Sequence, residues 1–166
     1  MIYIKLIYRG WISMDLKFRF SIIGLIVFIL PMIINVVYFM FPPLNTTETP
    51  KEENAILSMI EQGSRILFAI LICILVSNKK VDYQSPMLYL SILFLVLYYI
   101  VWLRYFIGMR EERLLGESFL FVPMPLAVFP VLYFLFAALW LHNYPAAVIM
   151  IIFGVAHNMI SYQSFH

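Results

Sequence analysis

The charged pair Glu61 and Arg65 lies four residues apart within an apolar part of the chain. On a helix this spacing puts both side chains on one face, with the carboxylate on the N-terminal side, the favourable order for an ion pair. Ionisable groups in apolar segments are costly and often mark ligand or proton pathways. We therefore expect one of three roles: an ion pair that locks helices together, an Arg65 that holds an anionic group while Glu61 tunes or transfers a proton, or side chains that extend toward the membrane surface without forming a site.

His157 is the second candidate, because it shares a helical face with Gly154 and Ser161. Small residues let membrane helices approach closely. His157 is predicted either to hydrogen-bond to a neighbouring helix or to handle a proton or bind a ligand. Asn158 and Asn35 add amide groups to the same candidate ligand-binding set. No second His, Cys or Asp lies at metal-ligand spacing from His157, so we predict neither a metal site nor a cofactor.

Three prolines, Pro123, Pro125 and Pro130, interrupt the apolar segment 118–141. A proline inside a helix removes a backbone donor, and unsatisfied backbone groups in lipid are tolerated only where protein or water meets them. We expect a kinked or locally unwound helix. Its bent face either lines a pocket, as broken helices do in transporters, or only packs against a neighbouring helix.

The composition of the chain excludes several classes of protein. Of the 166 residues, 64% are apolar and 12% are charged, and the mean hydropathy is +0.94. Soluble domains are about 45–50% apolar and about 25% charged, so we exclude a soluble globular enzyme, a disordered tail and a nucleic-acid-binding protein. The net charge of +2 is too small to indicate an anionic partner. The composition instead predicts a multi-pass integral membrane protein.

The apolar segments predict an all-α polytopic bundle of five transmembrane helices, because about 20 apolar residues are needed to cross the hydrocarbon of a bilayer. The expected spans are residues 20–41, 54–77, 86–106, 118–141 and 144–162. All five belong to one transmembrane domain, residues 20–163. Ser85 is expected to cap the third helix, with Pro86 as its first residue, and Gly108 to end it.

The charges predict how the bundle is oriented. Residues 1–19, which we expect to be a cytoplasmic or interfacial segment, hold four basic residues and one acidic residue, whereas the next loop has one lysine and three glutamates. The positive-inside rule then places the N-terminus inside and, after five spans, the C-terminus outside. Arg110 and Arg113 fall outside, against the rule. A capping box at residues 49–52 is expected to start the second helix near Pro50, outside the bilayer.

The candidate residues are expected to lie at a similar depth in the membrane. With five antiparallel spans, the polar residues all fall in the outer half of the membrane, and reversing the orientation moves them as one group. Arg104, near the outer end of the third span, is predicted either to extend toward the interface or to close a pocket. The residues expected in the outer half are Asn35, Glu61, Arg65, Arg104, Pro123, Pro125, His157 and Asn158.

These observations favour a membrane protein that binds, and by extension transports, a small anionic or amphiphilic molecule in an outward-side polar pocket. The alternatives are an intramembrane enzyme acting on a lipid or isoprenoid, with Glu61 or His157 as general acid or base, and a non-catalytic accessory or immunity-type subunit. We lean against an enzyme, because no nucleophile, base and orienting group stand out together. The expected partners are the lipid bilayer, a small-molecule ligand, and a second copy or a partner membrane subunit, but no nucleic acid. The expected location is a plasma membrane, bacterial by composition.

Overall fold

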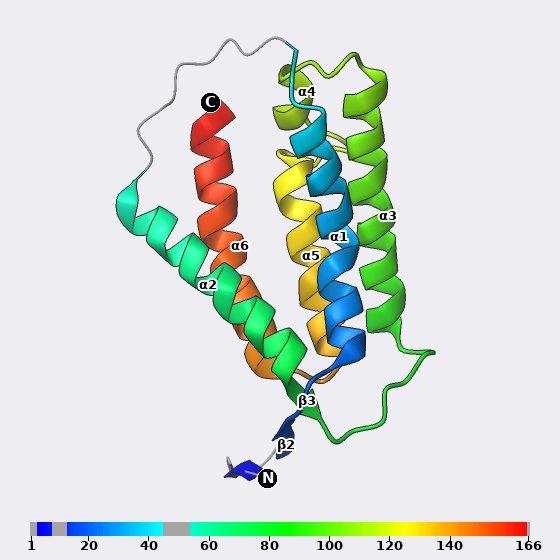
Figure 1. Cartoon of the computed structure of the whole chain (residues 1–166), viewed down its shortest axis with the longest axis vertical. Helices are drawn as coiled ribbons and strands as arrows, with labels where there is room; N and C mark the ends of the chain where they lie inside the picture. The colour runs from blue at the N-terminus through cyan, green and yellow to red at the C-terminus, as the bar shows by residue number, and fades with distance from the viewer. Residues whose placement is uncertain (1–2, 8–12, 45–53, 166) are drawn as a thin grey trace.

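The chain folds mainly into helices in the computed structural model, which describes residues 3–7, 13–44 and 54–165 (Figure 1). The helices are α1 (Ile22–Met40), α2 (Ala55–Ile74), α3 (Pro86–Ile107), α4 (Arg113–Gly116), α5 (Pro125–Trp140) and α6 (Tyr144–Phe165). Four of them, α1, α2, α3 and α6, are long and apolar enough to cross a membrane, whereas α5 has 16 residues. By helix length and hydropathy the chain is a multi-pass membrane protein, as predicted. The predicted count of five spans is not confirmed.

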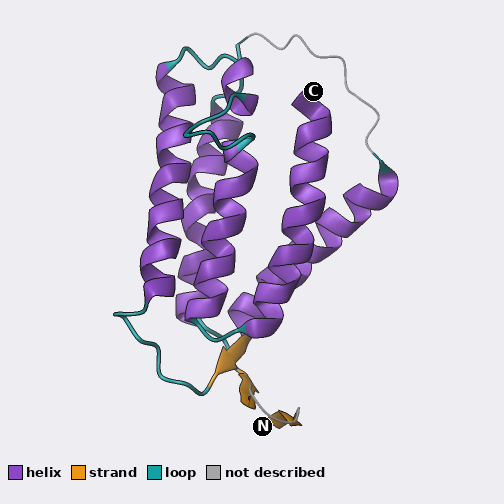
Figure 2. Cartoon of the chain, turned by 180° about the vertical axis from the view of Figure 1, so that it is seen from behind, coloured by secondary structure: helices purple, strands orange, loops and turns teal. Residues whose placement is uncertain are grey.

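The long helices form two groups that diverge toward one end of the molecule. Helices α1, α3 and α5 lie side by side, while α2 pairs with α6, and successive long helices alternate in direction (Figures 1 and 2). The groups are joined where α5 packs on α6 and where α1 meets α2. The main core lies at this junction, where Phe68, Ile72, Ala137 and Met150 are buried. Because apolar side chains from both groups pack closely at this junction, their packing sets the angle between the two groups of helices.

Local sequence signals explain where most helices begin. The Ser21 and Asn54 side chains accept hydrogen bonds from the first turns of α1 and α2, which satisfies amides that have no partner within the helix. Ser85 caps α3, Pro86 is its first residue, and Gly108 is its C-cap, all as predicted. The predicted capping box at residues 49–52 lies outside the described residues.

A small antiparallel sheet at one end of the bundle was not predicted. Its strands, in the order β1-β2-β3, are β1 (Tyr3–Ile7), β2 (Ser13–Phe18) and β3 (Leu75–Ser77), and Figure 2 shows them below the helices. Part of the N-terminal segment is therefore strand. Likewise α2 ends at Ile74, three residues before the predicted Ser77, because Leu75–Ser77 pair with β2. The alternation of polar and apolar residues in SMDLKF is the period expected of a strand.

Close backbone packing continues from the sheet into the start of α1. Arg19 and Ser21 donate backbone hydrogen bonds to the carbonyls of Ile74 and Cys73, at 2.8 and 2.7 Å. A Cβ atom at Gly24 would collide with the backbone carbonyl of Ile72. Glycine thus permits the two backbones to touch, which positions α1 against the end of α2.

Helix α5 begins seven residues later than the start of the span predicted for it, residues 118–141. Residues before Pro125 are not helical: Phe119 and Val122 exchange two backbone hydrogen bonds, and Leu120, Phe121 and Met124 have positive φ. Pro123 therefore precedes the helix and Pro125 occupies its first turn, where a missing N–H costs nothing. Only Pro130 lies inside α5. The local unwinding predicted for this span is thus a non-helical segment, residues 118–124, that precedes a shorter helix.

Candidate functional site

Glu61 joins α2 to α6 at the centre of the candidate site. Its Oε1 accepts a hydrogen bond from Nη2 of Arg65, one turn along α2, and pairs with Nδ1 of His157 on α6 at 2.8 Å. Only 7% of the Glu61 side chain is exposed. A buried carboxylate requires such partners, because an unpaired charge away from water is costly. Two of the three predicted roles, helix locking and site formation, are compatible with this geometry.

The pairing with Glu61 also favours one tautomer of the neutral His157 ring. An ionised carboxylate only accepts hydrogen bonds, so the proton of a neutral imidazole is placed on Nδ1, beside Glu61. The second nitrogen, Nε2, then keeps a lone pair. The ring stacks on Phe153 with centroids 4.9 Å apart, and the Arg65 guanidinium lies 5.5 Å from the centre of the same Phe153 ring. Phe153 thus restrains both polar side chains.

A cavity of about 440 Å³ lies next to this cluster, and α1, α2, α3, α5 and α6 all contribute to its wall. Its polar lining residues are Asn35, Tyr38, Arg65, Tyr98 and His157. The remaining lining is apolar or aromatic, and Trp102, Phe134 and Pro130 are part of it. Cavities of this size with apolar walls and a few polar groups are typical of small-molecule sites.

Arg65 gives the cavity a cationic side. Its side chain is 48% exposed, whereas the balancing Glu61 carboxylate is buried and is not part of the lining. A guanidinium carries five N–H donors, so its bond to Glu61 leaves donors for a further acceptor. Across the cavity, Asn35 accepts a hydrogen bond from the Tyr98 hydroxyl at 2.8 Å. The charge and donors therefore favour an anionic or hydrogen-bond-accepting group.

Other predicted site residues lie away from the cavity. Arg104 donates hydrogen bonds to the carbonyls of Leu114, Glu117 and Ser118, between 2.9 and 3.2 Å, so it holds the loop before α5. Asn158 donates to the Gly154 carbonyl of its own helix. Neither residue lines the cavity, nor do Pro123 and Pro125. Of the three prolines, Pro130 lines it.

Asn143 is a polar residue whose role the sequence analysis missed. It is 1% exposed, and its amide donates to the carbonyls of Leu71 and Leu75, both at 2.8 Å, at the end of α2. Its Oδ1 accepts from the Ala146 amide at the start of α6. The available signal was its position directly before a helix, where asparagine is a preferred cap.

Within the part of the chain that the structure describes, no three His, Cys, Asp or Glu side chains come together as a metal would require. The cluster is instead an ion pair and a carboxylate–imidazole pair at the edge of an apolar cavity. Such an arrangement can bind an anion, move a proton, or hold two helices together. No protein-family model matches the chain, and no curated protein or solved structure matches it either.

Proposed function

We propose that this protein binds a small amphiphilic molecule with an anionic group in the five-helix cavity. The observation that carries the proposal is the half-exposed Arg65 guanidinium on the wall of a cavity of about 440 Å³. The anionic group would accept hydrogen bonds from Arg65, and charge-assisted bonds of this kind are stronger than neutral ones. The proposal extends to transport of this ligand across the membrane. In that case His157 and Glu61 would transfer the proton whose movement is coupled to the ligand.

The walls support an amphiphile over a small hydrophilic anion. Phe28, Phe68, Phe134 and Trp102 all contribute to the lining, and transferring apolar surface out of water onto such walls is favourable. A hydrophilic anion would leave these aromatic surfaces without a partner. An acyl or prenyl chain would cover them while its head group stays at Arg65.

The proposed topology has five crossings, with the N-terminus inside and the cavity open to the outer side of a plasma membrane. Helix α5 is the short crossing, and the non-helical residues 118–124 complete its path. Backbone outside a helix is tolerated at membrane depth when protein satisfies it. The bond from Arg104 to the Ser118 carbonyl and the two backbone bonds between Phe119 and Val122 meet part of that requirement.

Binding of dibromostearate, an anionic amphiphile whose bromines quench tryptophan fluorescence, tests the proposal. Trp11→Phe and Trp140→Phe leave Trp102, in the cavity wall, as the only tryptophan. We expect saturable quenching, and we expect Arg65→Gln to raise the half-saturating concentration about tenfold, as the loss of one charge-assisted hydrogen bond implies. Arg65→Lys, which keeps the charge, should lose less.

Two controls separate binding from partition into the micelle. The methyl ester of dibromostearate has the same chain without a charge, and Arg113→Gln removes an exposed charge that is 70% accessible and outside the cavity. Equal quenching by acid and ester, or equal effects of Arg65→Gln and Arg113→Gln, would contradict the proposal. Thermal unfolding of each variant, and the charge-balanced Glu61→Gln/Arg65→Gln double variant, exclude a folding defect as the cause.

The Glu61–His157 pair favours one second candidate, an intramembrane enzyme acting on a lipid. A carboxylate at Nδ1 orients an imidazole so that Nε2 can serve as a general base, and His157 lines the cavity. This candidate predicts a new product in liposomes of bacterial phospholipid, detected by mass spectrometry, and its loss in His157→Asn. His142→Asn, in the loop before α6, is the matched control and should keep the product. Unchanged lipids with the native chain would exclude this activity for those lipids.

A further inference from the structure

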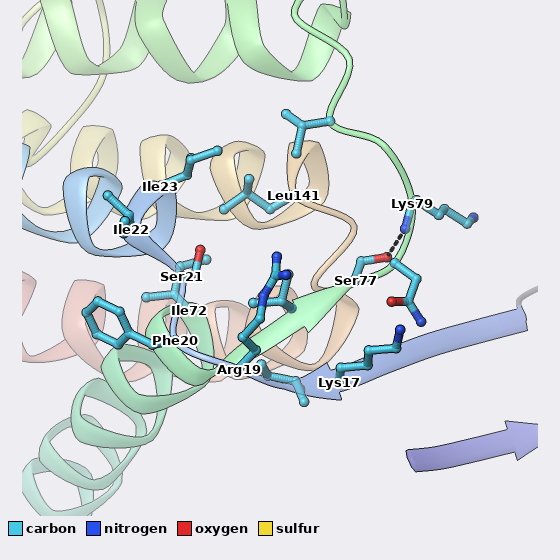
Figure 3. A pocket seen from close by; sticks show the side chains of 14 residues that line it. Lys17, Arg19, Phe20, Ser21, Ile22, Ile23, Ile72, Ser77, Lys79 and Leu141 are labelled. Carbon is cyan, nitrogen blue, oxygen red and sulfur yellow. Dashed lines mark hydrogen bonds between the residues drawn. The ribbon is translucent and has the colours of Figure 1, made fainter. Parts of the chain in front are cut away.

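A second cavity lies at the opposite end of the bundle, beside the sheet. It has a volume of about 560 Å³ and lies between the end of β2, the strand β3, the start of α1 and the loop that follows β3. Figure 3 shows the side chains around it, with Arg19 extending from the end of β2 toward the space between Ser21 and Ser77. This cavity shares no lining residue with the one at Arg65.

The charged groups that line this cavity are all basic. Lys17 and Arg19 come from β2 and its end, and Lys79 from the loop after β3, while no carboxylate belongs to the described lining. Among the residues that the structure describes, neither Arg19 nor Lys79 has an ion-pair partner. Arg19 and Lys79 lie around the same concavity, so an anion bound there gains from both of these charges.

The uncharged lining is amphiphilic. Ser77 and Asn78 provide polar groups near the basic side chains, whereas Ile22, Ile23 and Leu141 provide an apolar surface. Ile22 is also the first residue of the apolar helix α1. The cavity therefore lies at the depth where a membrane span begins, which is the depth of lipid phosphates in a bilayer.

We propose that this cavity binds a phosphate ester, supplied by the head group of an anionic phospholipid. The phosphate would lie among Lys17, Arg19 and Lys79, and the first carbons of the acyl chains would lie on Ile22 and Leu141. Arginine suits this role because its planar guanidinium can donate two parallel hydrogen bonds to two phosphate oxygens. Basic pockets between membrane helices on the cytoplasmic side bind anionic head groups in general, and the basic N-terminal segment orients this end toward the cytoplasm.

The test is a titration of the purified full chain in mild detergent, followed by native mass spectrometry. The probes are dioleoyl phosphatidylglycerol and dioleoyl phosphatidylcholine, which share acyl chains and differ in net charge. We expect phosphatidylglycerol to bind at least about tenfold more tightly. Each of Lys17→Gln and Arg19→Gln should weaken its binding about fivefold, the effect of one basic residue near an anionic head group.

Lys80→Gln is the matched control for Lys79→Gln, because Lys80 is the next residue and does not line the cavity. Binding should fall for Lys79→Gln and stay unchanged for Lys80→Gln. Arg19→Lys should restore most of the binding lost in Arg19→Gln, which excludes a fold defect. Equal binding of the two lipids, or equal effects of the Lys79 and Lys80 substitutions, would overturn the proposal.

Competition with glycerol phosphate distinguishes the two sources of the phosphate group. If it does not displace phosphatidylglycerol, the site requires the lipid. If glycerol phosphate displaces the lipid from the native chain but not from the Arg19→Gln variant, the same residues bind a soluble phosphate ester. That result would overturn the proposal that a lipid supplies the phosphate. These measurements do not involve Arg65 or dibromostearate, so failure here leaves the proposed function untouched.

Discussion

Replacing Asn143 by alanine is expected to lower the free energy of unfolding by about 3 kcal/mol, a large loss for a single uncharged side chain. The side chain makes three hydrogen bonds, to Leu71, Leu75 and Ala146, while almost fully buried. A typical hydrogen bond contributes about 1 kcal/mol net, and buried groups left without partners add to the loss. Alanine removes the Asn143 donor from both carbonyls, although the Leu71 carbonyl keeps the backbone N–H of Leu75 as a partner.

The measurement is unfolding of the purified protein by increasing SDS in mixed micelles, followed by tryptophan fluorescence. Asn158→Ala is the matched control, because it removes the same kind of side-chain amide but breaks only a bond to Gly154 within α6. We expect the control to lose less than about 1 kcal/mol. Similar losses for both variants would show that Asn143 does not join α2 to α6 as described.

The second large effect is expected at the ion pair. Arg65→Leu should cost about 3 kcal/mol, because it removes the permanent cation beside a buried carboxylate, and Glu61→Leu should cost a similar amount by leaving two donors without their acceptor. The double variant Glu61→Leu/Arg65→Leu should cost less than either single change, since no unpaired charge remains. The same SDS titration gives the three values and their coupling.

This double-mutant cycle also separates the proposed function from the accessory-subunit alternative. If the double variant is stable and still shows saturable quenching by dibromostearate, ligand binding does not depend on Arg65, and the charges serve only to hold α2 against α6, as the accessory-subunit alternative expects. If it is stable but loses saturable quenching, Arg65 acts on the ligand. Single variants as stable as the native chain would contradict the ion pair itself.

Most of the helical framework could be predicted because its signals are local. Ser85, Pro86 and Gly108 act within one turn of α3, so their positions in the chain are sufficient. The sheet could not be predicted in the same way, because β3 exists only through pairing with β2, far away in sequence. Without that partner, Leu75–Ser77 resembles the last turn of an apolar helix. The start of α5 was missed although its signal is local, since Pro123 and Pro125 flank Met124, a residue with positive φ, and the helix begins only at Pro125.

The candidate site was predictable to a similar extent. The Glu61–Arg65 pair follows from helical spacing and is present as expected. The pairing of Glu61 with His157 depends on which helices are neighbours, and spacing along one helix contains no such information. The acceptors of Arg104 could not be predicted either, because they are backbone carbonyls of α4 and of the residues that follow it.

The pairing of α2 with α6 has a consequence for biosynthesis. Glu61 and His157 are 96 residues apart, and ribosomes add about 5–20 residues per second. The carboxylate on α2 therefore leaves the ribosome about 5–20 s before its partner on the last helix exists. During that interval the Glu61 carboxylate has Arg65 as a partner on its own helix but not yet His157. We therefore expect α2 to stay in contact with water until α6 arrives. A nascent chain arrested before residue 144 should leave α2 accessible to a water-soluble label added from outside the membrane, and completion of α6 should protect it.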